Sequence, residues 1–163
     1  MPSLLEITSS AEDEKKWDPL LTKWGKGLME DSVKQEPRVN KLPKGKSNFV
    51  YSNMFDYDSR VFIIHTDDGA PCGYIAIQTH SHNPFLVNAK PTMMSVNELY
   101  IAEEHRRQGI ASWALRQVEE MAKKNKDIFV LQIQLYAKNA PADKAYEKFG
   151  FSDWSKTKVK FLR

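Results

Sequence analysis

Two spacings of hydrophobic residues in the second half of the chain predict elements of two kinds. From residue 110 to residue 122 the apolar positions follow the i, i+3, i+4 pattern of one helix face. From residue 129 to residue 136 apolar and more polar residues alternate, which is the period of a half-buried strand. The segment Met93–Ile101 precedes the helical pattern and predicts another strand. The helical stripe consists of Ile110, Trp113, Ala114, Val118, Met121 and Ala122.

The N-terminal third carries weaker patterns. Residues 4–8 are apolar and predict a first strand, and Ser10 can then cap a helix whose first turn is acidic. Asp18 and Pro19 resemble a new cap followed by proline at the first helical position, so we expect the helix to be interrupted there. Gly27 weakens the helix that follows by ~1 kcal/mol relative to alanine. The apolar stripe of that helix is Leu20, Leu21, Trp24 and Leu28.

Polar segments rich in proline and glycine separate the predicted elements. Residues 31–48 contain Pro37 and Pro43, and we interpret them as a mobile connection with room for a short helix. Residues 81–92 also form a predicted loop, and its apolar members at 85–87 are candidates for lining a binding cleft.

Two further pairs of strands are predicted. The β-branched run 61–66 and the run 73–79 flank turn-forming residues at 67–70, which is typical of an antiparallel hairpin. After residue 151 we expect a last pair of short strands around 155–156, which ends at 159–162.

The composition is that of an ordinary globular domain. The chain has 163 residues, of which 41% are hydrophobic and 28% charged, so we expect one domain over residues 1–163. The single cysteine, Cys72, excludes an intrachain disulfide. The beginning of the chain lacks the pattern of a signal peptide, and no apolar run reaches ~20 residues, so we expect a cytoplasmic protein without membrane contact. The formal charge of +3 is too small to favour nucleic acid as a partner.

A basic turn joins the strand Met93–Ile101 to the helix that begins at Ile110. The first backbone N–H groups of a helix have no internal partner, and the helix dipole is positive at that end. A phosphate group can bind there if the backbone is accessible, and the small residues Gly109 and Ala111 permit a close approach. Arg106 and Arg107 add positive charge. On these residues alone, a basic connecting turn is an equally good interpretation.

The segment 139–151 has the sequence features of a capped helix. Asn139 is a suitable N-cap and Pro141 lies in the first turn. Gly150 suits a left-handed C-cap, and Phe151 can then pack back on the last turn. The apolar face of this helix is Ala142, Ala145, Tyr146 and Phe149.

Together the two segments resemble the hallmarks of the GNAT N-acetyltransferase superfamily. The stretch Arg106-Arg107-Gln108-Gly109-Ile110-Ala111 fits the signature Arg/Gln-x-x-Gly-x-Gly/Ala, with alanine at the last small position. The second stretch fits Asn-x-x-Ala-x-x-x-Tyr-x-x-x-Gly-Phe from Asn139 to Phe151. The resemblance covers residues 61–151 well and the N-terminal third only by element order. It implies an α+β fold, a three-layer arrangement in which helices flank a mixed, mostly antiparallel sheet with splayed central strands.

The resemblance further implies direct acyl transfer from acetyl-CoA, without a metal, to an amine of a small molecule or a protein. Tyr146 would protonate the departing thiolate, and a carboxylate at Glu98 would take the proton of the amine. A surface carboxylate is an equally good interpretation of Glu98, because a register shift of one residue would turn it to the other face. The residues that the resemblance assigns to coenzyme binding are Leu99, Tyr100, Ile101, Arg106, Arg107, Gln108, Gly109, Ile110, Ala111, Ser112, Asn139, Ala142 and Tyr146.

Other interpretations stay open beside this one. The chain could be a non-catalytic acyl-CoA-binding module, or a nucleic-acid-directed protein on the same fold, although its basic residues are not interleaved with aromatic ones. The four histidines lack the spacing of a metal site, and His80-x-His82 is a pattern that occurs by chance. Cys72 has no base near it in the sequence that would make it a nucleophile. Relatives often pair, which leaves a homodimer open.

Overall fold

A mixed β-sheet forms the middle layer of the molecule. The computed structural model describes residues 1–38, 51–81 and 90–160. Within them five strands lie in the order β1-β2-β3-β4-β5, with antiparallel pairing from β1 to β4 and parallel pairing between β4 and β5. This arrangement confirms the predicted mixed, mostly antiparallel sheet. The strands are β1 (Ser3–Ile7), β2 (Arg60–His65), β3 (Pro71–His80), β4 (Met93–Ile101) and β5 (Val130–Ile133).

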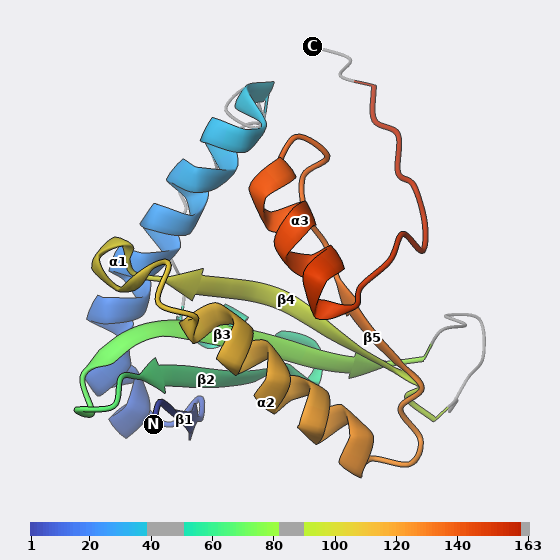
Figure 1. Cartoon of the computed structure of the whole chain (residues 1–163). Helices are drawn as coiled ribbons and strands as arrows, with labels where there is room; N and C mark the ends of the chain where they lie inside the picture. Colours follow the sequence, from blue (N-terminus) through green and yellow to red (C-terminus); the bar gives the residue numbers. More distant parts are fainter. Residues whose placement is uncertain (39–50, 82–89, 161–163) are drawn as a thin grey trace.

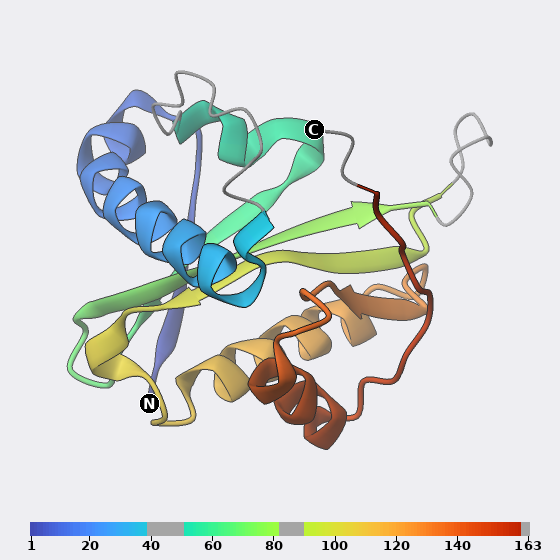
Figure 2. The same cartoon turned by 90° about the horizontal axis from the view of Figure 1, so that it is seen from above.

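Helices cover both faces of this sheet. Figures 1 and 2 show α1 (Ala11–Gln35) and the 3-10 helix η2 (Tyr51–Asp58) on one face, and α2 (Ile110–Lys124) and α3 (Ala140–Phe149) on the other. A short 3-10 helix, η3 (Glu103–His105), follows β4. Of the helices in the described ranges, none is long and apolar enough to cross a membrane.

Each face of the sheet has its own hydrophobic core. On the α2 side the core joins that helix to one set of strand residues, and Tyr146 and Phe149 of α3 pack against it. On the α1 side the core contains Trp17, Leu21 and Trp24 of the helix together with the alternate strand residues. The strand residues of the α2-side core are Phe62, Ile64, Cys72, Ile75, Ile77, Met94, Val96 and Ile101. Those of the α1-side core are Ile7, Val61, Ile63, Tyr74, Ala76 and Tyr100.

A β-bulge in β4 changes which residues face which core. Ala76 pairs with Glu98 whereas Ile77 pairs with Val96, so Asn97 is an extra residue without a partner on β3. Val96 before the bulge and Ile101 after it both face the α2 side. Simple alternation from Val96 would place Glu98 on the α2 side as well, whereas the extra residue Asn97 turns Glu98 toward the α1 side, where its partner Ala76 also lies.

The N-terminal helix is continuous, so the predicted interruption at Asp18 and Pro19 is wrong. Ser10 caps it as expected, with its hydroxyl accepting from the N–H of Asp13. Pro19 lies inside the helix on its exposed side, where the ring can be accommodated toward solvent. Trp17, on the opposite side, is buried with the rest of the apolar stripe in the α1-side core. Tertiary packing thus overrides the local signal for a helix break.

Other boundaries also differ from the predictions. Residues 31–35 continue α1, although the sequence predicted a connection from residue 31, and the predicted cleft residues 85–87 lie outside the described part of the chain. The strand predicted over 129–136 is wrong at both ends, because it reaches only from Val130 to Ile133 and Phe129 is 81% exposed. A strand needs a hydrogen-bonding neighbour, and β5 has one in β4 only where the two run together.

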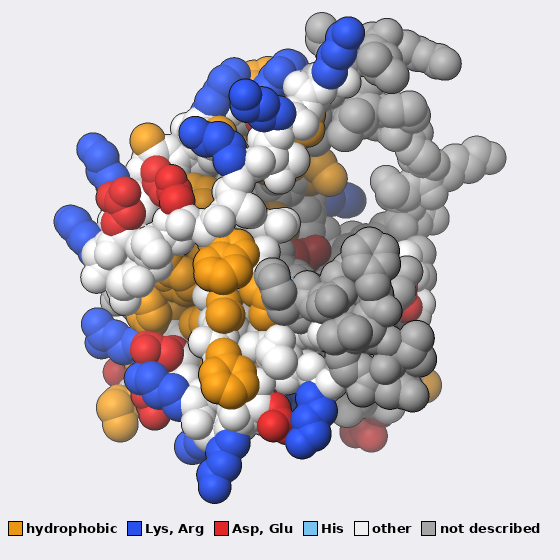
Figure 3. Space-filling view, turned by 90° about the vertical axis from the view of Figure 1, so that its right-hand side faces the viewer, with side chains coloured by type: hydrophobic (Ala, Val, Ile, Leu, Met, Phe, Trp, Pro, Cys, Tyr) orange, Lys and Arg blue, Asp and Glu red, His pale blue; other side chains and the backbone are white. Residues whose placement is uncertain are grey.

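Figure 3 shows hydrophobic side chains in the middle of the face at the right of Figure 1, with Lys and Arg around them.

The predicted last pair of strands is likewise wrong for residues 151–160, which have no regular structure. Val159 there is exposed, so the residues that suggested a strand by their side chains are not packed on the sheet. The remainder of the predicted pair lies outside the described residues.

Helix α1 lies so close to β4 that one position between them must be glycine. A methyl group added to Gly27 would overlap the hydroxyl of Tyr100, whose ring is buried in the α1-side core. The ring of Trp24, one turn earlier, lies 6.5 Å from that of Tyr100. The glycine that weakens the helix in isolation therefore permits the helix to dock.

We expect Gly27→Ala to lower the free energy of unfolding by about 1–3 kcal/mol, because overlap in a packed core outweighs the higher helix propensity of alanine. Urea denaturation measures the change. Lys26→Ala, at the exposed neighbouring position, is the control and should stay within about 0.5 kcal/mol of the wild type. A Gly27→Ala protein more stable than the wild type would contradict the close approach of α1 to Tyr100.

Candidate active site

The strands β4 and β5 separate in the middle of the sheet. They pair from Met93 with Val130 to Val96 with Ile133, where β5 ends, and β4 continues to Ile101. A cavity of about 410 Å³ opens at this point, lined from both strands. Its lining residues are Gln78, His80, Ser95, Val96, Asn97, Gln132, Ile133 and Gln134. The predicted separation of the central strands is thus present.

Beyond the separation, two residues of β4 present their backbone to the open edge. The N–H of Ala102 donates to the carbonyl of Cys72, on the β3 side. Successive residues of a strand direct their hydrogen-bonding groups to opposite edges, so Ile101 and Leu99 face away from β3 and Tyr100 faces toward it. Of the three residues that the resemblance assigned to coenzyme binding on this strand, Leu99 directs both backbone groups to this edge. Ile101 directs its N–H there, while its carbonyl accepts from Arg106, and Tyr100 packs its ring in the α1-side core.

The N-terminus of α2 is open to solvent. Arg107 and Gly109 both have positive φ, 62° and 80°, and this bent backbone leads into the helix, whose N-cap is Gly109. Ile110, Ala111 and Ser112 form the first turn, so their N–H groups have no partner within the helix. A Cβ atom placed on Gly109 would meet nothing within 4 Å, so a ligand can approach the helix end. The side chains of Arg107 and Gln108 on this turn are exposed.

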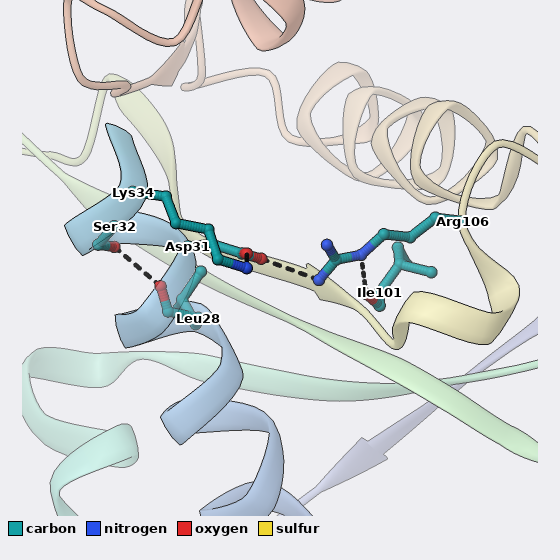
Figure 4. Close-up of polar contacts among 6 residues, drawn as sticks. All are labelled: Leu28, Asp31, Ser32, Lys34, Ile101 and Arg106. Carbon is teal, nitrogen blue, oxygen red and sulfur yellow. Dashed lines mark hydrogen bonds and ion pairs between the residues drawn. The ribbon is translucent and has the colours of Figure 1, made fainter. Parts of the chain in front are cut away.

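Arg106 points away from that helix end, toward α1. Its Nη2 donates to Oδ2 of Asp31 at 2.9 Å and its Nε to the carbonyl of Ile101 at 2.8 Å (Figure 4). The guanidinium also lies 5.3 Å from the centre of the Tyr100 ring. The guanidinium therefore ties the turn before α2 to the end of β4 and to α1, and the positive charge nearest the helix end on this turn is that of Arg107.

Helix α3 brings Asn139 and Tyr146 to the α2 side of the sheet. Asn139 is the N-cap, and its Oδ1 accepts from the N–H of Ala142 at 3.3 Å, which uses its oxygen. Tyr146 is half-buried, packs against the α2-side core, and lies with its ring 5.9 Å from that of Phe151. Burial raises the pKa of the Tyr146 hydroxyl, so it keeps its proton at neutral pH.

Glu98 lines a second cavity, of about 210 Å³, on the α1 side of the bulge. The hydroxyl of Tyr74 donates to its Oε2 at 2.6 Å. This cavity and the first share Gln78 and Asn97, so the two adjoin. The other residues that line it are Asn53, Met54, Asp56, Ser59 and Ala76.

Sequence reasoning missed two residues of this arrangement, Asp31 and Tyr74. Asp31 is 75 positions from Arg106, and Tyr74 is 24 positions from Glu98. Neither belongs to a motif, and the bulge at Asn97 that brings Glu98 to Tyr74 leaves no mark in the spacing of residues. Only the paired register of β3 and β4 reveals the second contact.

Of the cysteine and the described histidines, His80 is the one that lines a cavity of this site. Cys72 is buried, and burial raises the pKa of its thiol to about 11, so the thiolate is scarce at neutral pH. His80 shares a hydrogen bond of 2.7 Å with the hydroxyl of Ser95 in the larger cavity. Over residues 1–38, 51–81 and 90–160 no three His, Cys, Asp or Glu residues are placed to hold a metal ion.

Comparison with known proteins places these features in a wider group. The model of the acetyltransferase (GNAT) family matches residues 26–151. No curated protein sequence matches the chain. A tetramutant of a Bacillus halodurans protein superposes with a TM-score of 0.76 at 16% identity, over 98% of this chain and 99% of that chain.

Two other solved structures share the fold. A ribosomal-protein-alanine N-acetyltransferase from Brucella melitensis biovar Abortus has a TM-score of 0.65 at 17% identity, over 98% of this chain and 99% of that one. AAC(6')-Iy, in complex with the bisubstrate analogue CoA-S-monomethyl-acetylneamine, has a TM-score of 0.61 at 12% identity, over 100% and 99%. At these identities the likeness shows the fold.

We expect Asp31→Asn, which removes the ion pairs with Arg106 and with Lys34, to lower the free energy of unfolding by less than about 1 kcal/mol. The side chains of Asp31, Arg106 and Lys34 are 30%, 34% and 65% exposed, so solvent screens both pairs. Urea denaturation at low and high salt measures it, and the effect should shrink in high salt. Asp127→Asn breaks the longer and more exposed pair with Lys90 and serves as the control. A loss at Asp31 that salt leaves unchanged would contradict an ionic role for this contact.

Proposed function

Because the chain belongs to the GNAT acetyltransferase family and is an acyltransferase, we propose that it moves an acetyl group from acetyl-CoA to an amine by direct attack. The observation that carries this proposal is the open N-terminus of α2 beside the unpaired edge of β4. One element can bind phosphate, and the other can bind an amide-containing chain. We further infer that residues 1–163 act as one catalytic domain.

The coenzyme fits these two features in order. Its diphosphate would accept hydrogen bonds from the free N–H groups of Ile110, Ala111 and Ser112, with Arg107 and Gln108 beside it. Its pantetheine arm contains amides that can pair with the exposed backbone of β4, as an additional strand would. AAC(6')-Iy, which shares this fold, was solved in complex with a CoA-containing analogue, and this supports an acyl-CoA as the cosubstrate.

Asn139 can add one contact to that arm. Its oxygen caps α3, and its side-chain N–H₂ group remains available as a hydrogen-bond donor. Ala142, in the first turn of α3, is small and leaves room beside the cap. The two residues that the sequence matched to the family therefore combine a structural and a binding role.

The reaction requires two proton transfers. The acceptor amine must be neutral to attack the thioester carbonyl, since an alkyl ammonium has a pKa of about 10. Glu98 takes the proton from the amine as the new C–N bond forms, because its carboxylate lines the smaller cavity, which adjoins the one at the strand separation. The C–S bond then breaks, and Tyr146 gives its proton to the CoA thiolate. The raised pKa of Tyr146 keeps that proton available.

The acceptor would reach Glu98 through the two adjoining cavities. Their lining is polar, with five side-chain amides, one imidazole and the carboxylates of Asp56 and Glu98. Such a lining suits an amine on a hydrogen-bonding molecule, either small or a protein segment. The names of the solved neighbours fit both kinds, since one acetylates a ribosomal protein and the other was solved with an aminoglycoside-containing analogue.

The proposal is tested by mixing the protein with acetyl-CoA and a pooled library of amines and peptides, and by measuring thiol release and acetylated products. Turnover of an amine supports acetyl transfer. Binding of acetyl-CoA without turnover of any acceptor would favour a non-catalytic acyl-CoA-binding module instead.

We expect Gly109→Glu to weaken acetyl-CoA binding by at least ~100-fold, because it places a negative side chain where the diphosphate should lie. Calorimetry measures the affinity. Gly69→Glu is a matched control, since Gly69 also has positive φ, 84°, and open space around it but lies in the β2–β3 turn. Native affinity in a folded Gly109→Glu protein would show that the phosphate site lies elsewhere.

We expect Tyr146→Phe to lower kcat roughly 100-fold while the affinity for acetyl-CoA stays within about twofold, because only the hydroxyl is lost. Steady-state kinetics and calorimetry on the same preparation give both numbers. Thiols with a lower pKa leave without help, so an activated thioester should recover part of the lost rate. Unchanged kcat with acetyl-CoA would remove Tyr146 from the mechanism.

A further inference from the structure

We propose that Tyr74 is a positioning residue that holds the Glu98 carboxylate in place for the acceptor amine. This inference rests on the proposed function, in which Glu98 takes the proton of the amine. Tyr74 does not belong to either sequence signature, and its assignment comes from the contact between β3 and β4 alone.

The hydroxyl of Tyr74 is fixed by its surroundings. The residue is fully buried, with its ring stacked on Trp24 of α1 at 6.2 Å and 16°, and lies 6.3 Å from the ring of Tyr100. A ring packed between two others cannot rotate its hydroxyl away without disturbing the core. The oxygen atom therefore stands at a defined point at the edge of the core, 2.6 Å from Oε2 of Glu98.

Glu98 is an exposed side chain that would otherwise move freely. It lies on β4 directly after the bulged residue Asn97, and a glutamate has three side-chain torsions to order. A short hydrogen bond from a hydroxyl to a carboxylate is among the stronger neutral-to-charged contacts in proteins. Only Oε2 bonds Tyr74, and among the described residues no side chain bonds Oε1, which leaves that oxygen for the amine.

The donor role of Tyr74 holds over the pH range in which the enzyme would work. Burial raises the pKa of its hydroxyl well above the usual value, and the charge of Glu98 raises it further. Tyr74 thus stays protonated and donates to the carboxylate, and it does not compete with Glu98 for the proton of the amine. The other carboxylate on the same cavity, Asp56 of η2, has no such donor among the described contacts.

A purely structural role for Tyr74 makes a different prediction from a positioning role. If the ring only fills the core, removal of the hydroxyl should change stability and leave the rate unchanged. If the hydroxyl acts through Glu98, removal should lower the rate only while Glu98 is present. A double-mutant cycle separates the two, because residues that act through each other are not additive.

The experiment compares kcat and acetyl-CoA affinity for Tyr74→Phe, Glu98→Gln and the double variant, with an amine that the wild type acetylates. We expect Tyr74→Phe to lower kcat about 10-fold with an unchanged affinity for acetyl-CoA. In the Glu98→Gln background the same substitution should lower kcat by less than about twofold. Tyr51→Phe is the matched control, since Tyr51 is buried in the same core and also donates at 2.6 Å, but to the carbonyl of Thr8.

Each outcome decides the matter. Additive effects of Tyr74→Phe and Glu98→Gln, or an equal loss in Tyr51→Phe, would overturn the positioning role and leave acetyl transfer standing. A wild-type kcat in Glu98→Gln would overturn it as well. A wild type that binds acetyl-CoA but acetylates no amine would overturn the proposed function and this inference with it. If Tyr74→Phe fails to fold, Glu98→Asp shortens the carboxylate away from the Tyr74 hydroxyl, and an unchanged kcat there would overturn the inference.

Discussion

Backbone groups of β4 beyond Val96 have no β5 partner in the described part of the chain, because β5 ends at Ile133. Unpaired N–H and C=O groups of a strand must bond water, a side chain or another molecule. The carbonyl of Ile101 is satisfied by Arg106, and this contact marks the limit of the open edge. The molecule thus keeps a strand position vacant next to a helix end that is itself unsatisfied, and the proposed coenzyme fills both with one chain.

The two faces of the sheet divide the chemistry between them. On one face lie α2, with the turn that precedes it, and α3, which carries Tyr146. On the other face the aromatic core under α1 supports Tyr74, which in turn contacts Glu98. The bulge at Asn97 directly follows Val96, which pairs with Ile133 at the end of β5, and the two cavities adjoin at this level of the sheet. A donor and an acceptor entering from different sides would meet at that opening, which is the geometry that direct transfer requires.

The sequence was sufficient for elements whose signals are local. The strand β4, the helix α2 and the capped helix α3 follow from periodicity, a cap and a glycine within a few residues of each other. It failed where distant packing decides. Pro19 predicts a helix break, yet the helix continues through it because Trp17 and Leu21 pack its apolar side against the sheet. Side-chain alternation after residue 128 predicts a long strand, yet β5 extends only over the residues that pair with β4.

A match to a family signature identified the turn before α2 but did not identify what each side chain in it contacts. Arg106 occupies the first position of the signature, and its charge is already compensated by Asp31. A guanidinium has five N–H donors, and the contacts with Asp31 and with the Ile101 carbonyl use two of them while they hold the group toward α1. We propose that the free amides of the first helical turn and Arg107, whose side chain is exposed, supply most of the attraction for a diphosphate. Backbone amides cannot be altered by substituting a side chain. That part of the site therefore depends on the positive φ of Gly109 and on the position of the turn. Asp31 on α1 holds the turn in place through Arg106.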